Sequence, residues 1–193
     1  MVGPTTFGYQ NLGFGAGGAD FGKLELIETQ TVSGVSAINF TNLETSTYDV
    51  HFLTVNDFQP ATDNVILSIR FAESGTLETA AVYHVACQEY YSNGSFSEFR
   101  STGISRIRFI ENTGNATNES GHAYVYFYNL GDSSKYSNVN FQTQGQGIDN
   151  LPIGAFGSGV LPQTSTVDEI QLGTYDVSSN FSATASLYGI KEE

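Results

Sequence analysis

The sequence predicts an all-β protein, an antiparallel β-sandwich of the jelly-roll type, and three observations carry this prediction. Many short segments alternate apolar and polar residues, as strands with one buried face do. Polar loops rich in Gly, Asn, Ser and Thr separate these segments, and helical periodicity is nearly absent. About eight to ten strands of this kind, without a fixed repeat, fit two packed sheets in one domain.

The chain begins with a segment, residues 1–22, whose composition differs from the rest. It contains seven glycines, with aromatic and apolar residues among them at no strand or helical period. Glycine loses much backbone entropy on ordering, so the segment should not fold alone, and a disordered tail is one interpretation. Its aromatic content favours another, an arm that docks on a partner. The docking residues would be Phe7, Tyr9, Leu12, Phe14 and Phe21, and the sandwich domain would follow as residues 23–193.

The first strands of the sandwich are expected at residues 24–31 and 35–40, ahead of a central hairpin over residues 48–71. In the second arm of this hairpin, alternate apolar residues define a core face. They are Val65, Leu67, Ile69 and Phe71. Pro60 and the Asp and Asn residues around it favour a turn between the arms. We therefore expect the two arms to pair antiparallel inside a sheet.

Later strands are expected at residues 79–89, 104–110, 123–130, 167–172 and 181–190. In the third of these, tyrosines alternate with apolar residues, which places the tyrosines on one strand face, exposed or at an interface. They are Tyr124, Tyr126 and Tyr128. Residues 131–165 are rich in loop-forming types and are predicted to be irregular backbone with short strands.

Charge and cysteine content exclude several classes of function. The chain has 20 acidic and 7 basic residues, a net charge of -13, which contradicts a phosphate-binding nucleic-acid face and opposes binding to anionic lipid. One cysteine, Cys87, excludes an internal disulfide, and three scattered histidines give no zinc-ligand spacing, so we expect no cofactor. No apolar run approaches the roughly 20 residues of a membrane span, and the N-terminus lacks a signal-peptide pattern. We expect synthesis in a cytoplasm and no membrane insertion.

None of the candidate catalytic groups has a productive spacing. His84 and Cys87 would point to opposite faces of one strand, as would the carboxylates of Asp168 and Glu169. The glycine-rich GFGAGG has no strand before it and no Lys-Ser/Thr helix after it, unlike a phosphate-binding loop. The sequence therefore predicts a protein that is not an enzyme.

Two polar loops are the candidate binding surfaces. One is aromatic, and the other, within residues 111–121, is rich in asparagine. Aromatic rings stack on sugar faces and amides bond to hydroxyls, so a neutral glycan is the expected ligand. The candidate contacts are Tyr90, Tyr91, Phe96, Asn112, Asn115 and Asn118. The alternative is that these tyrosines are ordinary residues of a β-sheet.

Several segments, taken in order along the chain, resemble a family of tailed-bacteriophage virion proteins that is frequent in phages of aquatic bacteria. They are FGYQNLGFGAGG, KLELIETQTVSGVSAINFTNL, NDFQPATDNVILSIRFAESG, VDEIQLGTYDV and FSATASLYGIK. The resemblance implies a jelly-roll or lectin-like domain, commonly a homotrimer, on the virion surface as a tail-fibre tip, head fibre or capsid decoration. It implies no catalytic residues.

From the residues and the resemblance together we expect an exposed virion appendage. It would be anchored to other virion proteins through residues 1–22 and would mediate host attachment. The alternatives are a decoration protein that cements the capsid lattice and a carbohydrate-active enzyme on the same fold.

Overall fold

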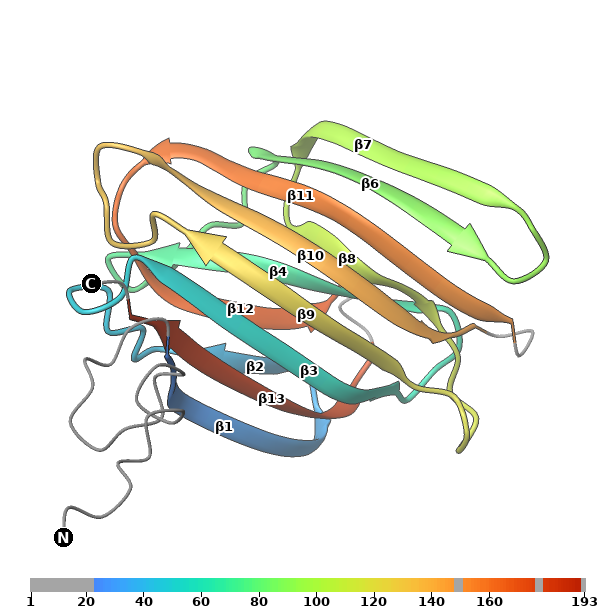
Figure 1. Cartoon of the computed structure of the whole chain (residues 1–193). Coiled ribbons are helices and arrows are strands. Elements are labelled where there is room, and N and C mark those ends of the chain that lie inside the picture. Colours follow the sequence, from blue (N-terminus) through green and yellow to red (C-terminus); the bar gives the residue numbers. More distant parts are fainter. Residues whose placement is uncertain (1–22, 148–150, 176–178, 192–193) are drawn as a thin grey trace, which may run out of the picture.

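The computed structural model describes residues 23–147, 151–175 and 179–191, in which the regular elements are strands (Figure 1). The strands are β1 (Leu24–Val35), β2 (Ala37–Phe40), β3 (Val50–Pro60), β4 (Val65–Glu73), β5 (Thr76–Leu77), β6 (Tyr83–Tyr91), β7 (Phe96–Ile104), β8 (Ile107–Thr113), β9 (Gly121–Tyr128), β10 (Tyr136–Gln146), β11 (Pro152–Thr164), β12 (Val167–Thr174) and β13 (Phe181–Ile190). The described residues include no helix with both the length and the hydrophobicity that crossing a membrane requires. The predicted docking residues Phe7, Tyr9, Leu12, Phe14 and Phe21 lie outside the described residues.

The strands form two antiparallel sheets with the topology of a jelly roll. The larger, eight-stranded sheet has the order β1-β13-β3-β9-β10-β11-β6-β7, and the smaller has the order β2-β12-β4 with β5 and β8 both paired to β4. The quartets β1-β13-β3-β9 and β2-β12-β4-β8 interleave as two Greek keys, which is the jelly-roll arrangement. The predicted fold class is therefore confirmed. Strands β10, β11, β6 and β7 widen the larger sheet beyond this unit.

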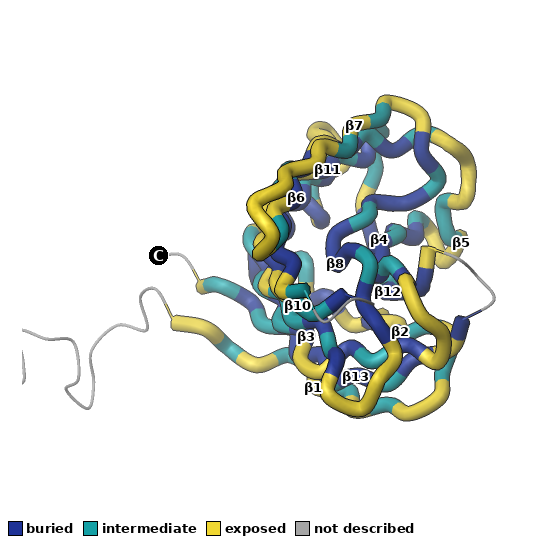
Figure 2. Tube along the Cα trace, turned by 90° about the vertical axis from the view of Figure 1, so that its right-hand side faces the viewer, coloured by how far each residue is buried: buried dark blue, intermediate teal, exposed yellow. Residues whose placement is uncertain are grey.

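The core lies between the two sheets. Figure 2 shows buried positions facing the interior and exposed positions on the outer sides. Every second residue of β4, from Val65 to Phe71, is buried, as the alternation predicts. Phe71 meets Phe127 of β9 across the interior, with ring centroids 6.0 Å apart. This packing fixes which face of the larger sheet points outward.

The predicted central hairpin is wrong. Strand β3 pairs with β9 and β13 in the larger sheet, whereas β4 pairs with β12, β5 and β8 in the smaller one. The connection between them bridges the two sheets: Ala61 donates its N–H to the carbonyl of Asn180 at 2.8 Å, and the Thr62 hydroxyl donates to that of Ser179 at 2.9 Å. Proline and asparagine signal a change of direction, but they do not determine which sheet the next strand joins.

The prediction of irregular backbone over residues 131–165 is also wrong. Strands β10 and β11 form a long antiparallel pair, from Tyr136 opposite Thr164 to Gln146 opposite Pro152. Their many Gly, Asn and Gln residues have low strand propensity, but Val139, Phe141 and Leu161 face the core and hold the pair in place. Strand β7, which was not expected, is an edge strand that pairs with β6 alone.

The larger sheet has two distinct ends, which follow from its register. At one end lie Leu24, Ile190, Val50 and Tyr128, paired in that order across β1, β13, β3 and β9. We call this the Lys23 end, because the described chain enters there. At the opposite end, which we call the distal end, lie Gln146, Pro152 and the β6–β7 turn (Figure 1).

Candidate ligand-binding face

The outer face of the larger sheet carries two polar rows side by side. All outward positions of β10 from Asn138 to Gln146 are amides, because alternate residues of a strand share a face. They are Asn138, Asn140, Gln142, Gln144 and Gln146. The neighbouring strand β9 places Tyr124, Tyr126 and Tyr128 outward, as the sequence predicts, while Val125 and Phe127 are buried.

We call this surface the amide–tyrosine face and define it by the outward residues of four adjacent strands. They are Phe52, Thr54 and Asn56 of β3; His122, Tyr124, Tyr126 and Tyr128 of β9; Asn138, Asn140, Gln142, Gln144 and Gln146 of β10; and Pro152, Gly154, Phe156, Ser158 and Val160 of β11. None of these is Asp, Glu, Lys or Arg, although the chain contains 20 acidic and 7 basic residues. At the border of the face, Nε2 of His122 lies 3.8 Å from the exposed carboxylate of Asp57. A surface with so few charged groups in so acidic a chain suits an uncharged partner with many hydroxyl groups.

Contacts within the face hold its rings and amides in place. Tyr124 donates its hydroxyl to Oε1 of Gln142 at 2.5 Å, which joins the two rows. Phe52 packs against Tyr126, with ring centroids 4.9 Å apart, and lies 6.1 Å from the ring of Tyr188. Such contacts reduce the side-chain entropy lost when a ligand binds.

Two adjoining depressions at the distal end form what we call the distal hollow. Their volumes are about 430 and 390 Å³, and both are lined by Tyr90, His122 and Gln144. Asn118 and Gln146 line one of them, and Tyr124 and Gln142 line the other. Each lies in the size range of small-ligand pockets, roughly 300–1,000 Å³.

A larger depression, the proximal hollow, lies on the same outer face nearer the Lys23 end. It has a volume of about 730 Å³ and is lined by residues of β6, β7, β9, β10 and β11, among them Tyr128, Asn138, Asn140, Ser158 and Arg100. Its one guanidinium is already paired, because Arg100 lies 3.4 Å from the carboxylate of Glu98. The proximal hollow is therefore nearly uncharged, and its lining is mainly apolar.

Tyr90 owes its position to a glycine on the neighbouring strand. Gly154 of β11 is the register partner of Tyr90, and a Cβ at Gly154 would lie 2.1 Å from Cζ of the tyrosine. The ring of Tyr90 therefore covers Gly154 and forms a wall of the distal hollow. Phe96 is opposite Tyr90 on β7 and is 73% exposed.

The other predicted contact residues divide between the interior and the distal loops. Tyr91 and Asn112 point inward: the Tyr91 hydroxyl donates to Oε2 of Glu89 at 2.6 Å and accepts a 3.4 Å bond from Nδ2 of Asn112. Asn115 ties its loop to the β3–β4 connection through Ala61 and Asp63. Asn118 lines the distal hollow with Tyr90, so the structure brings the two predicted loops together there.

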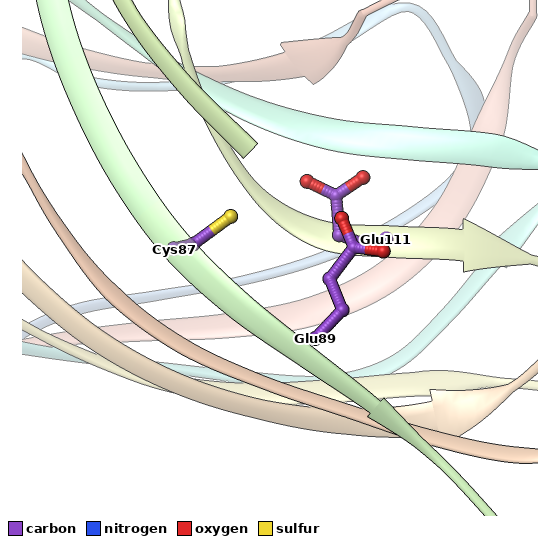
Figure 3. A group of neighbouring side chains, drawn as sticks. All are labelled: Cys87, Glu89 and Glu111. Atoms are coloured by element: carbon purple, nitrogen blue, oxygen red, sulfur yellow. The ribbon is translucent and has the colours of Figure 1, made fainter. Parts of the chain in front are cut away.

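A buried polar cluster behind this face was not predicted. Cys87 and Glu89 of β6 and Glu111 of β8 point toward one another, with their ligand atoms all within 4.8 Å (Figure 3). Arg108 donates two hydrogen bonds to Glu111 and thereby neutralises one of the two carboxylates. Thiolate sulfur and carboxylate oxygen are groups that bind divalent cations.

The electrostatics of the cluster oppose nucleophilic chemistry. Burial raises the pKa of the Cys87 thiol to about 11, so the thiol is protonated at neutral pH. Burial also raises the pKa of Glu111, although Arg108 acts in the opposite direction. Sequence reasoning missed the cluster for two reasons. The residue composition places Glu111 in a loop, and the sequence does not show that β6 of the larger sheet faces β8 of the smaller one. The available signal was the spacing of Cys87 and Glu89, which puts both on one strand face.

Comparisons with known proteins show no family for this chain. No family model matches it, and no curated protein matches it. One similar solved structure is a variant fructofuranosidase from Schwanniomyces occidentalis complexed with fructosylnystose, with 6% identity and a TM-score of 0.22. The match covers 88% of this chain and 34% of the enzyme chain, so this chain spans about a third of that protein. A likeness this weak carries no argument about function.

Proposed function

We propose that this chain is a non-enzymatic appendage on the surface of a bacteriophage virion, where it binds a neutral host-surface glycan through the amide–tyrosine face. The observation that carries the proposal is the pair of neighbouring rows, five outward amides on β10 beside three outward tyrosines on β9, on a face without charged residues. The face is the ligand site, and the sandwich is its rigid support.

The chemistry of the face matches that of a neutral sugar. A pyranose ring has apolar C–H faces, which stack on aromatic rings, and a rim of hydroxyls, which both donate and accept hydrogen bonds. Tyrosine supplies the ring and a hydroxyl, and each Asn or Gln amide supplies both a donor and an acceptor. The distal hollow combines the two kinds of group in Tyr90, Tyr124, Gln142, Gln144 and Asn118.

The position of the site agrees with attachment through residues 1–22. The described chain starts at the Lys23 end, whereas the β6–β7 turn lies at the distal end (Figure 1). Tyr90 and Phe96 are paired next to this turn. An appendage docked through its N-terminal residues on other virion proteins would present the distal hollow to the host. The virion setting and the homotrimer rest on the sequence resemblance.

Binding measurements with the full chain test the proposal. Calorimetry or a glycan array should show binding of neutral oligosaccharides, and Tyr90→Ala and Tyr124→Ala should each weaken it by roughly tenfold or more. The matched control is Tyr136→Ala, because Tyr136 is 49% exposed on β10 but lies outside the hollows. Failure of every neutral glycan to bind, or equal effects of the three substitutions, would argue against this function.

The capsid-decoration alternative makes a different prediction about stoichiometry. A decoration protein would follow the copy number of the capsid lattice, whereas a fibre tip would occur in small multiples of three. Quantitative mass spectrometry of purified particles separates them. The enzyme alternative requires that the full chain release reducing ends from a bound glycan.

A further inference from the structure

We propose that the distal and proximal hollows are two parts of one site, occupied together by a single linear neutral polysaccharide that lies along β10. The protein would then recognise internal segments of a long glycan in preference to chain ends or short sugars. This inference rests on the proposed function and specifies its ligand.

Strand β10 links the two hollows with a continuous row of amides. Asn138 and Asn140 line the proximal hollow, and Gln142, Gln144 and Gln146 line the distal one. At about 3.4 Å per residue, outward side chains recur every 7 Å or so, and the row from Asn138 to Gln146 extends roughly 27 Å. A row of that length exceeds what one sugar unit can contact, and a polymer can use all of it.

Phe156 provides the aromatic platform between the hollows. It is 54% exposed, and its register partner on β10 is Gln142, in the middle of the amide row. The outward residues on either side of it on β11 are Gly154, beneath Tyr90, and Ser158, in the proximal hollow. The small, exposed Ser158 leaves a low path on the proximal side of the ring, whereas on the distal side the Tyr90 ring covers Gly154 and forms a wall of the distal hollow.

A fourth depression connects Phe156 with the proximal hollow over β6 and β7, where the Glu98–Arg100 ion pair lines it. It has a volume of about 330 Å³ and is lined by Phe156 together with Ala86 and Arg100, which also line the proximal hollow. The amide row reaches from the second residue after the start of β10 to its last residue, so the path follows nearly the whole length of the strand. A path of this length accommodates an internal segment of a long chain.

The arrangement implies a dependence of affinity on ligand length. An oligosaccharide short enough to fill the distal hollow alone would bind weakly, and one long enough to reach the proximal hollow would gain the second set of contacts within one molecule. Joining two weak contacts in this way raises affinity by roughly a hundredfold or more when the spacing fits.

Isothermal titration calorimetry of the full chain tests this with gluco-, manno- and galacto-oligosaccharides, from disaccharides to octasaccharides. Affinity for the bound series should rise steeply with length and then level off. Ser158→Lys fills the proximal hollow from an exposed strand position, and it should reduce the affinity for long oligosaccharides to that for short ones. The matched control is Ser97→Lys, which adds the same group at an exposed position of β7 outside the hollows.

The possible failures are distinguishable. Binding that does not change with length, or long oligosaccharides that bind Ser158→Lys as tightly as the native chain, would overturn the inference and leave the proposed function standing. Absence of binding by every series at every length would overturn both. Equal losses with Ser158→Lys and Ser97→Lys would also count against a continuous site, because the effect would then be one of charge alone.

Discussion

Tyr90 and Tyr91 are adjacent in the chain but serve opposite sides of β6. Tyr90 covers Gly154 on the outer face, whereas Tyr91 bonds to the buried Glu89. The sequence alone groups them in one loop, and only their place in a strand separates their roles. Burial together with the bond to Glu89 raises the pKa of Tyr91 to about 12. Tyr91 therefore stays neutral and structural, and Tyr90 is the residue that a ligand can contact.

Gly154→Ala should displace the ring of Tyr90 without removing it. The new Cβ would lie 2.1 Å from Cζ of Tyr90, so the ring must move away from the strand. We expect weaker glycan binding with a loss of stability within the roughly 1–3 kcal/mol that overpacking costs. Titration calorimetry and thermal unfolding measure the two effects.

Gly173→Ala is the control, because the nearest atom to its new Cβ, the Ser36 carbonyl oxygen, lies 3.6 Å away. If Gly154→Ala bound glycan as the native chain does, the position of Tyr90 would be irrelevant to the site.

His51 should make the stability of the protein sensitive to mild acid. Burial lowers the pKa of its imidazole, although the Leu43 carbonyl and the carboxylates of Asp49 and Glu44 act in the opposite direction. The unfolded chain takes up the proton below about pH 6.5 and the folded chain does so only at lower pH, so stability is lost as the pH falls. His51 should contribute no more than about 1.4 kcal/mol per pH unit to the change of unfolding free energy with pH.

Urea unfolding of the native chain and of His51→Gln, followed between about pH 7 and pH 5, checks this prediction. Glutamine keeps an N–H that can donate to Leu43, as Nε2 of His51 can across its 2.5 Å contact, but it does not titrate. Parallel pH profiles of the two proteins would exclude His51 as the cause.

At the scale of the elements, β4 shows what periodicity can predict and what it cannot. Its alternation identifies a strand and its core face, because burial of every second residue imposes that pattern. The pattern does not identify the partner strands, and β4 joins the smaller sheet although its neighbour in sequence, β3, joins the larger one. Strand β10 shows the opposite case: its outward amides obscured a strand that its inward Val139 and Phe141 define.

The candidate site was predictable only where it depended on single residues. The sequence identifies Tyr90, Phe96 and Asn118 as polar or aromatic groups of predicted loops, although Tyr90 and Phe96 lie in β6 and β7. The tyrosine row of β9 follows from alternation. The amide row could not be recognised without β10 as a strand. Its approach to β9 depends on long-range pairing between Tyr124 and Gln142, which local sequence does not encode.

Leu67→Ala in β4 should cost about 2–5 kcal/mol of unfolding free energy, the usual cost of truncating a buried aliphatic residue. Leu67 is fully buried in the core. Its neighbour Ser68 is also buried, but it contributes one hydrogen bond, to the carbonyl of Gly173 at 2.7 Å. Ser68→Ala should therefore cost less, about 0.5–1.5 kcal/mol. Chemical denaturation of both variants compares them, and similar small losses would contradict a central place for β4.

At the scale of the whole molecule, most of the charge lies away from the proposed ligand-binding face. The chain has a net charge of -13, yet the middle of its larger sheet presents no charged side chain. The net charge opposes close approach of copies, while the uncharged face remains available to a neutral partner. Association as a trimer would have to leave that face accessible for the proposed function to hold.

Deletion of residues 1–22 should leave a folded domain that no longer joins the virion. The hydrogen-bonded pairing of β1 begins with Leu24 opposite Ile190, and the buried core of the described chain begins at Ile38, so the pairing and core that the structure describes lie within residues 23–193. The thermal midpoint and glycan affinity of residues 23–193 should match those of the full chain, while incorporation into particles, measured by complementation of a deletion phage and quantitative mass spectrometry, should be lost. Particles that incorporate the shortened chain at the native level would show that the sandwich itself docks, and a shortened chain that fails to fold would show that the segment belongs to the domain.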